Sequence, residues 1–455
     1  MQSMNRVQWT GRFAALLCAA ALAACGGGGS SSSSSSGGGS TTFGTKQLGA
    51  TGANTFGNSV TTDKDGNVYV AGNTNRGLDD NTRTGAIDFF VTKYNSSGVK
   101  LFTKQMGVKD KDTWGHSVTT DKGGNVYVAG STTGGLDDNT LTGSKDFFVT
   151  KYNSSGEKLF IKKIGVKDKN TSGRSVATDT DGNVYVAGYT DGGIDGNTLS
   201  ANGNNDFFIT KYNSSGEKLF IKQMGVKDRD TRGYSVATDR DGNVDVAGYT
   251  NGELDGRTKT GANYDFFVIK YDSNGEQQFT KQMGAATGNT YGKSVATDKD
   301  GNIYVAGYTY GGLDDNTVSG NGNADCFVTK YNSSGEKQYT KQLGVAGAGT
   351  DGYYSVATDK GGNVYVAGDT SRGLDGNTLT GSRDFFVTKY NSIGEKLFTK
   401  QMGVTGKYTQ GYSVATDTKG NVYVAGITKG GLDGNNLVGT QDFFLVSNNA
   451  SGVKR

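Results

Sequence analysis

Gly66-Asn67-Val68-Tyr69-Val70-Ala71-Gly72 decides the fold, because nearly the same seven residues return six more times along the chain. Successive copies start 58 to 61 residues apart, so one unit of almost constant length is repeated seven times. A repeat that runs through most of a 455-residue chain predicts one array of similar units and not two or three unrelated domains. The copies begin at Gly66, Gly124, Gly182, Gly242, Gly301, Gly362 and Gly420.

The composition favours short strands joined by tight turns. Hydrophobic residues make up 33% of the chain, glycine occupies 74 positions and proline is absent. Glycine permits the positive φ angles that tight turns need, and the chain has little material for a large helical core. The formal net charge is only +3, so we predict no nucleic-acid partner.

Each repeat predicts four β-strands, named A to D, which we place in the second copy at residues 117–121, 125–129, 146–152 and 158–164. Strands A and B, and strands C and D, are joined by short turns that contain glycine, whereas the other two connections are long. Because antiparallel strands alternate in direction, both long loops lie on one face of the assembly. We expect binding on this long-loop face.

The ends of the repeat region predict how the array closes. The last copy stops after its strand C at 442–446, and a segment with the signature of strand D, Thr45-Lys46-Gln47-Leu48-Gly49, precedes the first strand A. We therefore predict an all-β, seven-bladed β-propeller of four-stranded antiparallel blades over residues 43–455, with the N-terminal strand closing the last blade. We expect this propeller to be a monomer.

The repeated motif also resembles a known family. Asp-x-x-Gly-Asn-Val-Tyr-Val-Ala-Gly followed by Asp-Phe-Phe-Val-Thr-Lys-Tyr is similar to the bacterial SBBP-type β-propeller repeat, and the resemblance covers residues 43 to about 449. It implies a secreted or envelope-anchored propeller and no defined reaction. Three copies depart from the motif, at Asp245, Cys326 and Ser447-Asn448, and we interpret these changes as drift.

The N-terminus resembles that of a bacterial lipoprotein. Two arginines precede an apolar segment at 13–24, and Leu22-Ala23-Ala24-Cys25 is similar to a lipobox, whose cysteine is lipidated. We expect 1–24 to be a signal peptide, Cys25 to carry the lipid, and 25–42 to be a flexible Gly/Ser tether. Gly26 favours the outer membrane, so the predicted location is the bacterial cell envelope. The alternative is an ordinary cleavage site with an accidental cysteine.

Comparison of the seven copies with one another predicts the binding site. The residue immediately before the serine of strand A varies while the scaffold does not, and a second variable position, occupied by Phe56, Trp114, Ser172, Arg232, Tyr291 and Gln410, precedes it by two. We expect the first set to line the mouth of a central channel and to bind a sugar polymer or an extended peptide. The alternative is that unconstrained loop positions simply vary. The candidate ligand-binding residues are Asn58, His116, Arg174, Tyr234, Lys293, Tyr354 and Tyr412.

The sequence predicts no catalytic residues and no assigned metal site. His116 is the single histidine, and no Gly-x-Ser-x-Gly motif is present. Acidic pairs such as Asp79-Asp80 recur at equivalent places, which is typical of turn-forming residues. One alternative stays open, because Leu136-Asp137-Asp138-Asn139 followed by Asp146 offers oxygen ligands of the kind that calcium prefers.

Together these features predict a membrane-anchored, non-enzymatic binding scaffold that presents the long-loop face of a propeller to a protein or polysaccharide partner. Two alternatives remain: a carbohydrate-active propeller enzyme, or a purely structural envelope protein without a ligand.

Overall fold

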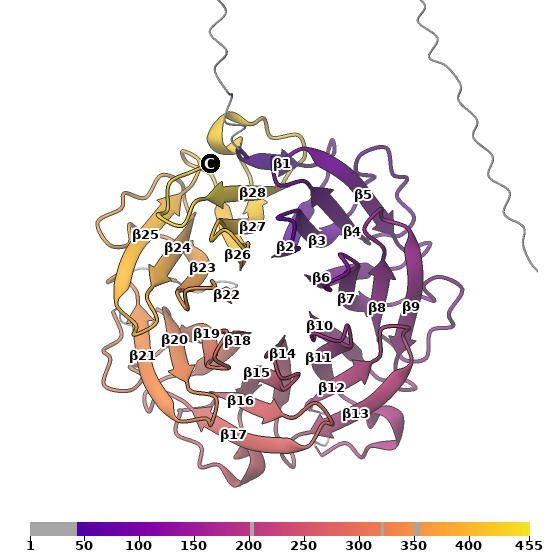
Figure 1. Cartoon of the computed structure of the whole chain (residues 1–455), viewed down its shortest axis with the longest axis vertical. Coiled ribbons are helices and arrows are strands. Elements are labelled where there is room, and N and C mark those ends of the chain that lie inside the picture. The colour runs from indigo at the N-terminus through magenta and orange to yellow at the C-terminus, as the bar shows by residue number, and fades with distance from the viewer. Residues whose placement is uncertain (1–42, 201–203, 320–322, 348, 351–354) are drawn as a thin grey trace, which may run out of the picture. The chain divides into compact units, whose positions relative to one another are not determined.

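The computed structural model describes residues 43–200, 204–319, 323–347, 349–350 and 355–455. In these ranges 28 β-strands form seven four-stranded antiparallel sheets, arranged as blades around a central axis (Figure 1). Three 3₁₀ turns, η1 (Ile194–Gly196), η2 (Leu254–Gly256) and η3 (Leu432–Gly434), interrupt the long loops. The predicted all-β seven-bladed propeller is confirmed. No helix in the described ranges has the length and apolar character to cross a bilayer.

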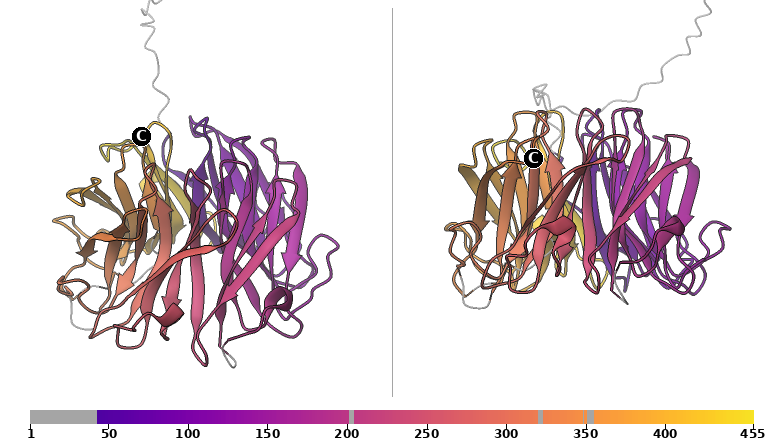
Figure 2. Two further views of the ribbon diagram at one scale, coloured as in Figure 1. Left: turned by 60° about the horizontal axis from the view of Figure 1, so that its bottom comes forward. Right: turned by 90° about the horizontal axis from the view of Figure 1, so that it is seen from below.

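The four strands of each blade run between the two faces of the ring (Figure 2). The innermost strands are β2 (Thr55–Thr62), β6 (Thr113–Thr120), β10 (Thr171–Thr178), β14 (Thr231–Thr238), β18 (Thr290–Thr297), β22 (Ser355–Thr358) and β26 (Thr409–Thr416). The second strands are β3 (Val68–Thr74), β7 (Val126–Thr132), β11 (Val184–Thr190), β15 (Val244–Thr250), β19 (Ile303–Thr309), β23 (Val364–Thr370) and β27 (Val422–Thr428). The third strands are β4 (Asp88–Tyr94), β8 (Asp146–Tyr152), β12 (Asp206–Tyr212), β16 (Asp265–Tyr271), β20 (Asp325–Tyr331), β24 (Asp384–Tyr390) and β28 (Asp442–Asn448). The outermost strands are β5 (Lys100–Met106), β9 (Lys158–Ile164), β13 (Lys218–Met224), β17 (Gln277–Met283), β21 (Lys337–Leu343), β25 (Lys396–Met402) and β1 (Lys46–Leu48).

Strands C and D of the second copy have the predicted bounds, but strands A and B are longer than predicted. Strand β6 begins at Thr113, four residues before the predicted start, and β7 ends at Thr132, three residues after the predicted end. Gly115 and His116 interrupt the first extension and Gly130 interrupts the second, and glycine is depleted in strands, so the composition does not carry the predicted strands past these residues. Six of the seven candidate binding residues, all except Tyr354, which lies outside the described residues, consequently lie inside the innermost strands and not in the loops before them.

The N-terminal strand closes the ring as predicted. Strand β1 pairs with β28, and Gln47 lies opposite Phe444 in the register. The Gln47 side chain donates a hydrogen bond to Asp442 at 2.9 Å and accepts one from the backbone N–H of Leu432 at 3.0 Å. The C-terminus also contributes, because the N–H of Gly44 donates to the carbonyl of Arg455 at 2.9 Å. Residues from both ends therefore complete the seventh blade.

Two continuous rings of hydrogen bonds link the innermost strands. In the first ring a serine Oγ of each blade accepts a backbone N–H from the next, as in Val118 N–H to Ser59 Oγ at 3.1 Å. In the second, a threonine hydroxyl donates to a carbonyl of the preceding blade, as in Thr120 to Thr62 at 3.1 Å. Both rings are complete, since Val60 N–H donates to Ser413 Oγ and the Thr62 hydroxyl donates to the Thr416 carbonyl. These bonds explain why the Ser and Thr of strand A barely vary.

The hydrophobic core lies between neighbouring blades. The paired phenylalanines of strand C contact across six of the seven gaps, as in Phe89 against Phe148 and Phe147 against Phe208, both with ring centroids 5.0 Å apart. Burial of one such side chain contributes about 1.5–3 kcal/mol. Cys326, fully enclosed where the other copies have the first of these rings, breaks this series between the fifth and sixth blades. The core thus repeats from blade to blade, and the variable residues lie outside it.

Candidate functional site

The candidate residues lie at β-bulges. In β2, Gly57 pairs with Gly72 and Ser59 pairs with Ala71, so Asn58 has no partner in the ladder. The same register shift occurs in β6, β10, β14, β18 and β26. A bulge residue is released from the sheet pattern and its side chain is redirected. The bulge also requires the last glycine of the repeated motif, because a Cβ on Gly72 would lie 1.6 Å from the carbonyl oxygen of Phe56.

Four of the seven candidate residues contact one another along successive blades. The Arg174 guanidinium lies 3.4 Å from Nε2 of His116 on one side and 5.2 Å from the ring centroid of Tyr234 on the other. The Lys293 ammonium lies 3.9 Å from the centroid of the same Tyr234 ring. His116, Arg174, Tyr234 and Lys293 therefore form one continuous line on blades two to five.

Two of the remaining candidate residues, Asn58 and Tyr412, bond to amide groups instead. The Asn58 amide donates to Asn73 Oδ1 and to the Gly115 carbonyl, both at 2.8 Å, and the Tyr412 hydroxyl donates to Gln410 Oε1 at 3.0 Å. Tyr354 lies outside the described residues. The described candidate positions thus differ around the axis, since blades three to five carry tyrosine and cationic side chains in contact, blade one carries an amide, and blade seven carries a tyrosine bonded to an amide.

The sequence analysis missed the largest part of this surface. Tyr189, Tyr249 and Tyr308 occupy the position before the last threonine of the second strand, opposite the second variable position of the innermost strand. Their signal was present in the sequence, because the residue between Ala-Gly and Thr of the motif varies from copy to copy. The predicted strand B, residues 125–129 in the second copy, ends before this position and so does not include it.

We call the resulting cluster of rings the tyrosine patch. Its members lie in contact, with ring centroids 5.2 Å apart for Tyr234 and Tyr249, and 4.9 Å apart for Tyr249 and Tyr291. Offset and edge-to-face pairs at these distances are favourable, and within them Tyr249 is buried whereas Tyr234 and Tyr291 stay half-buried. The tyrosine patch comprises Tyr189, Tyr234, Tyr249, Tyr264, Tyr291 and Tyr308.

Three cations are embedded in the tyrosine patch. Lys293 lies 3.9 to 5.7 Å from the centroids of four of its rings, and Arg232 lies 5.0 Å from that of Tyr189. Burial, together with the nearby charges of Arg174 and Arg232, lowers the pKa of Lys293 to about 7. A lysine whose protonation is balanced near neutral pH is unusual on a protein surface and is typical of functional sites.

His116 is neutral in this setting. Burial, reinforced by the charges of Arg174 and Lys145, lowers the pKa of His116 well below its usual range. Nε2 of His116 lies 2.9 Å from the Ser131 hydroxyl and 3.4 Å from the Arg174 guanidinium, which can only donate. His116 therefore supplies no positive charge to the patch at neutral pH.

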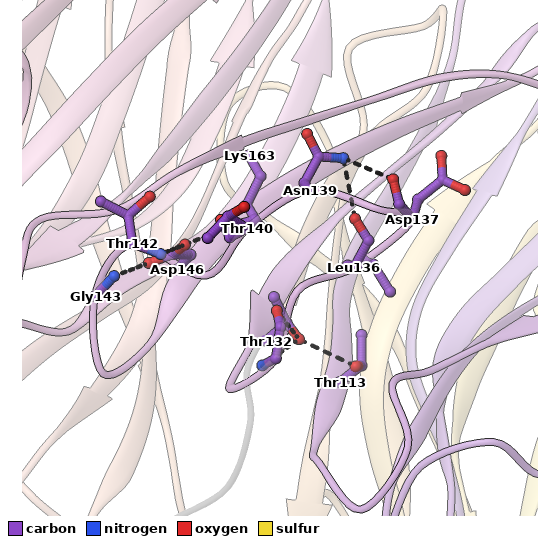
Figure 3. A network of polar contacts seen from close by, with 11 residues as sticks. Thr113, Thr132, Leu136, Asp137, Asn139, Thr140, Thr142, Gly143, Asp146 and Lys163 are labelled. Carbon is purple, nitrogen blue, oxygen red and sulfur yellow. Dashed lines mark hydrogen bonds and ion pairs between the residues drawn. The ribbon is translucent and has the colours of Figure 1, made fainter.

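The aspartates considered for calcium serve as turn-formers (Figure 3). Asp137 adopts a positive φ of 55° and its carboxylate pairs with Lys158. The Asp146 carboxylate accepts backbone N–H groups three and four residues earlier, at 2.7 and 2.8 Å, and pairs with Lys163. Asn139 donates its amide to two carbonyls of the turn. In the described ranges no three His, Cys, Asp or Glu side chains are gathered as a metal site requires.

The opposite end of the axis is also hollowed. A pocket of about 360 Å³ lies at the short-turn face, where the innermost strands of blades two to six end. Threonines and alternating Asp, Arg and Lys side chains line it, and none of the aromatic residues of the patch does. The two ends of the axis therefore have different chemistry.

The fourth blade departs from the repeat beside a further pocket. In six blades the strand B tyrosine donates its hydroxyl to the turn aspartate, as in Tyr185 to Asp179 at 3.1 Å. Asp245 replaces this tyrosine in the fourth blade and is fully buried, and neither of its carboxylate oxygens has a hydrogen-bond partner among the described residues. A pocket of about 570 Å³, lined by Asp239 and Lys270 among others, lies beside this turn.

Comparison with known proteins agrees with this architecture. The SBBP β-propeller repeat matches seven stretches, which together make up more than half of the chain: residues 44–79, 101–137, 159–195, 219–255, 278–314, 338–374 and 397–433. The chain belongs to the SBBP β-propeller repeat family. Each SBBP repeat spans the outermost strand of one blade and the two inner strands of the next, so the repeat unit is offset from the blade. The offset accounts for the seventh blade receiving its outermost strand from residues near the start of the first repeat.

Two curated proteins and one solved structure are similar to this SBBP protein. It is 25% identical over 428 residues to the regulatory protein FlaEY of Caulobacter vibrioides, covering 81% of this chain and 43% of FlaEY. It is 24% identical over 493 residues to an uncharacterized WD repeat-containing protein, L264, of Acanthamoeba polyphaga mimivirus, covering 81% of this chain and 35% of that protein. This chain therefore spans less than half the length of either relative. A PL25 ulvan lyase, a polysaccharide lyase bound to -[GlcA(1-4)Rha3S]-, is similar with a TM-score of 0.50 and 12% identity, covering 90% of this chain and 98% of the lyase. At that identity the likeness concerns the fold alone.

Proposed function

We propose that the protein is a binding module that holds an extended macromolecular ligand, a polysaccharide or a protein segment, on the tyrosine patch without changing it chemically. The observation that supports this proposal is the contiguous set of tyrosine rings with embedded cations on blades three to five. The rest of each blade repeats almost unchanged. Ring faces and hydroxyl groups on a rigid scaffold suit stacking and hydrogen bonding to a ligand.

The test is a binding screen with a matched pair of variants. We expect a glycan array or a pull-down with the soluble form that starts near Ser40 to give a saturable ligand. Tyr249→Ala should weaken that interaction at least tenfold, because Tyr249 contacts three other rings of the patch and Lys293. Tyr339→Ala, which removes a ring from the outermost strand β21, is the control and should bind normally. A ligand that binds equally to both variants would refute this location, and the absence of any saturable ligand would favour a purely structural envelope protein.

A carbohydrate-active enzyme is the second candidate. Lys293, with its pKa lowered to about 7 beside several phenol groups, has the properties of a general base, and the fold is shared with the PL25 polysaccharide lyase. The two candidates differ in turnover. Incubation with a panel of polysaccharides should release no new chain ends if the protein only binds, whereas release that is lost in Lys293→Met would favour the enzyme.

We also propose that the propeller is attached to a bacterial membrane, in the envelope and at the outer membrane, through a lipid on Cys25. The support is the order of charged, apolar and small residues before Cys25 and the Gly/Ser-rich residues after it, all of which lie outside the described residues. Mass spectrometry of the N-terminal peptide, with Cys25→Ser as control, tests this point. An unmodified peptide from membrane fractions of the wild type would contradict it.

A further inference from the structure

Two cations of the tyrosine patch lack a counter-ion. Among the described residues, the Lys293 ammonium faces four tyrosine rings and has neither a hydrogen bond nor an ion pair. Arg174 contacts His116 and Tyr234, and it too has no carboxylate. Arg232 differs, because its Nε lies 2.9 Å from the carboxylate of Asp230. The patch therefore holds an excess of positive charge on blades three and five.

Such an excess is unfavourable in the free protein and favourable toward an anion. Partial burial withdraws water from both cations, and each raises the electrostatic cost of the other. An incoming oxyanion would restore the missing hydrogen bonds, and charge-assisted bonds to lysine and arginine are among the stronger polar contacts in proteins. The site is thus complementary to a negatively charged group flanked by surfaces that stack.

The surroundings favour a sugar polymer over a peptide as the carrier of that group. An extended peptide commonly binds by adding a strand to an open sheet edge. The inner edges of these blades are already engaged, because Val236 N–H and Val295 N–H donate to the serine hydroxyl groups of neighbouring blades at 3.1 and 3.0 Å. Flat rings with hydroxyl groups match the faces and hydroxyl groups of sugar rings, and they require no exposed backbone.

We propose that the tyrosine patch binds an acidic polysaccharide, and that a carboxylate or sulfate group of this polymer sits against Lys293 and Arg174. This inference rests on the proposed binding function and adds the class of ligand. The half-buried rings of Tyr234 and Tyr291, which Lys293 contacts, then provide the stacking surface beside the acidic group, and the buried Tyr249 supports them from behind.

If the patch binds an anion at Lys293, ligand affinity should depend on pH, whereas a cluster with only a structural role would show no such dependence. The charged and titratable groups that face Lys293 are Arg174, Arg232, Tyr234, Tyr249, Tyr291 and Tyr308, with Asp230 behind Arg232. Burial and the two arginines lower the pKa of Lys293 to about 7 in the free protein, and a bound anion would raise it again. Binding above pH 7 should therefore take up a proton, and affinity should fall as the pH rises from 6 to 8.

The experiment measures binding of defined probes by isothermal titration calorimetry. The probes are polygalacturonate, its carboxyl-reduced form, dextran sulfate, dextran and polyglutamate, each titrated at pH 6 and pH 8 in two buffers of different ionisation enthalpy. We expect the two acidic polysaccharides to bind and the two neutral ones to bind at least tenfold more weakly. We expect affinity for the acidic polysaccharides to fall about tenfold from pH 6 to pH 8, as a pKa of about 7 requires.

Three variants locate the effect. Lys293→Met keeps the aliphatic stem and should lose at least tenfold in affinity at pH 6, together with the proton uptake and the pH dependence. Arg174→Ala should lose affinity but keep the proton uptake. Lys281→Met, which removes a lysine that lies over Phe279 on the outermost strand β17, is the matched control and should bind normally. Asp245, whose pKa is also near 7, is present in all three and so does not account for a difference between them.

The outcomes separate this inference from the proposed function. If neutral and acidic glycans bind alike, and binding is lost in Tyr249→Ala but not in Lys293→Met, the binding function stands and the acidic ligand is wrong. Polyglutamate that binds as tightly as the polysaccharides would overturn the choice of a sugar polymer. If no probe binds at either pH, while another ligand that depends on the patch is found by the screen, the ligand class is also wrong.

Discussion

Replacing Asp245 with tyrosine tests the energetics of the repeat within a single blade. In six blades a buried tyrosine fills this position and bonds to the turn aspartate, and in five of them a lysine lies over its ring, as Lys211 lies 5.1 Å from the centroid of Tyr185. In the fourth blade Lys270 lies opposite Asp245 in the register but donates to Asp239 at 2.9 Å. The corresponding Lys211 instead donates to a carbonyl of the next blade, at 2.7 Å.

The cost of Asp245 can be calculated from its burial. Burial raises the pKa of Asp245 from 3.8 to about 7, against a smaller opposing effect from Lys270. The folded protein therefore keeps a proton that the unfolded chain has already lost above pH 4. Stability consequently falls as the pH rises from about 4 to about 7, and the full loss is present above pH 7. At about 1.4 kcal/mol for each pKa unit, that loss is roughly 4 kcal/mol.

Urea unfolding of the wild type, Asp245→Asn and Asp245→Tyr at pH 5 and pH 8 measures this effect. We expect Asp245→Asn to abolish a stability difference of about 2.5 kcal/mol between pH 5 and pH 8, because asparagine does not titrate and about two of the three pKa units of the shift lie in this window. Asp245→Tyr should also gain about 1.5–3 kcal/mol at both pH values from burying the ring. If the wild type and Asp245→Asn lose stability in parallel between pH 5 and pH 8, the reasoning about this carboxylate is wrong.

Four further predictions follow. Deleting residues 43–49 should lower the free energy of unfolding by several kcal/mol, because it removes the strand that pairs with β28 and the fully buried Phe43. Deleting residues 30–36 of the Gly/Ser segment is the control and should leave the free energy of unfolding unchanged. Equal melting temperatures for the two deletions would count against ring closure. Gly72→Ala should destabilise the first blade by more than about 1 kcal/mol, because its Cβ would overlap the Phe56 carbonyl. Gly52→Ala, with no atom within 4 Å of the added Cβ, measures only the cost of a positive φ. Chemical denaturation compares the two variants, and equal losses of stability would contradict the steric argument. Tyr185→Phe should cost about 1–3 kcal/mol because it removes one buried hydrogen bond to the Asp179 carboxylate, which keeps its bonds from Asp181 and Asn183. Tyr234→Phe at a bulge should cost under about 0.5 kcal/mol, and the reverse order by thermal unfolding would refute the division between scaffold and surface. Calcium added in calorimetry should give no binding heat and no change in melting temperature, because the loop aspartates are engaged in turns and ion pairs; a saturable heat would restore calcium as a ligand.

The architecture could be predicted because its determinants are local and repeated. Gly66, Gly124 and their equivalents adopt positive φ in the A–B turn, and the paired phenylalanines mark strand C in every blade but one. The closing strand could be predicted by counting the strands of each type, since Lys46-Gln47-Leu48 has the signature of a strand D and the last copy lacks a strand D after its strand C. Each of these signals needs no knowledge of which residues meet in space.

The site was harder to predict because it depends on a bulge. The alternation of side chains along a strand fails where one residue is extra, so the ladder around Gly57 and Ser59 could not be inferred from a period of two. The positions were identified by their variation, but their depth in the strand and their partners Tyr189, Tyr249 and Tyr308 were not. Asp245 was interpreted as drift, and only the buried, unpartnered carboxylate shows that it changes the energetics of its blade.

The bulge also explains how a repetitive scaffold can hold a specialised surface. The two rings of Ser and Thr hydrogen bonds fix the innermost strands just beyond the bulge, and the phenylalanine pairs fix the blades outside it. The bulge residue itself makes no ladder bond, so Asn58, Arg174 and Lys293 can replace one another with little effect on the frame. Copies of the repeat can therefore diverge at this position while the ring stays closed. On blades three to five this freedom has placed tyrosine rings and cations in mutual contact, and the proposed binding site depends on that arrangement.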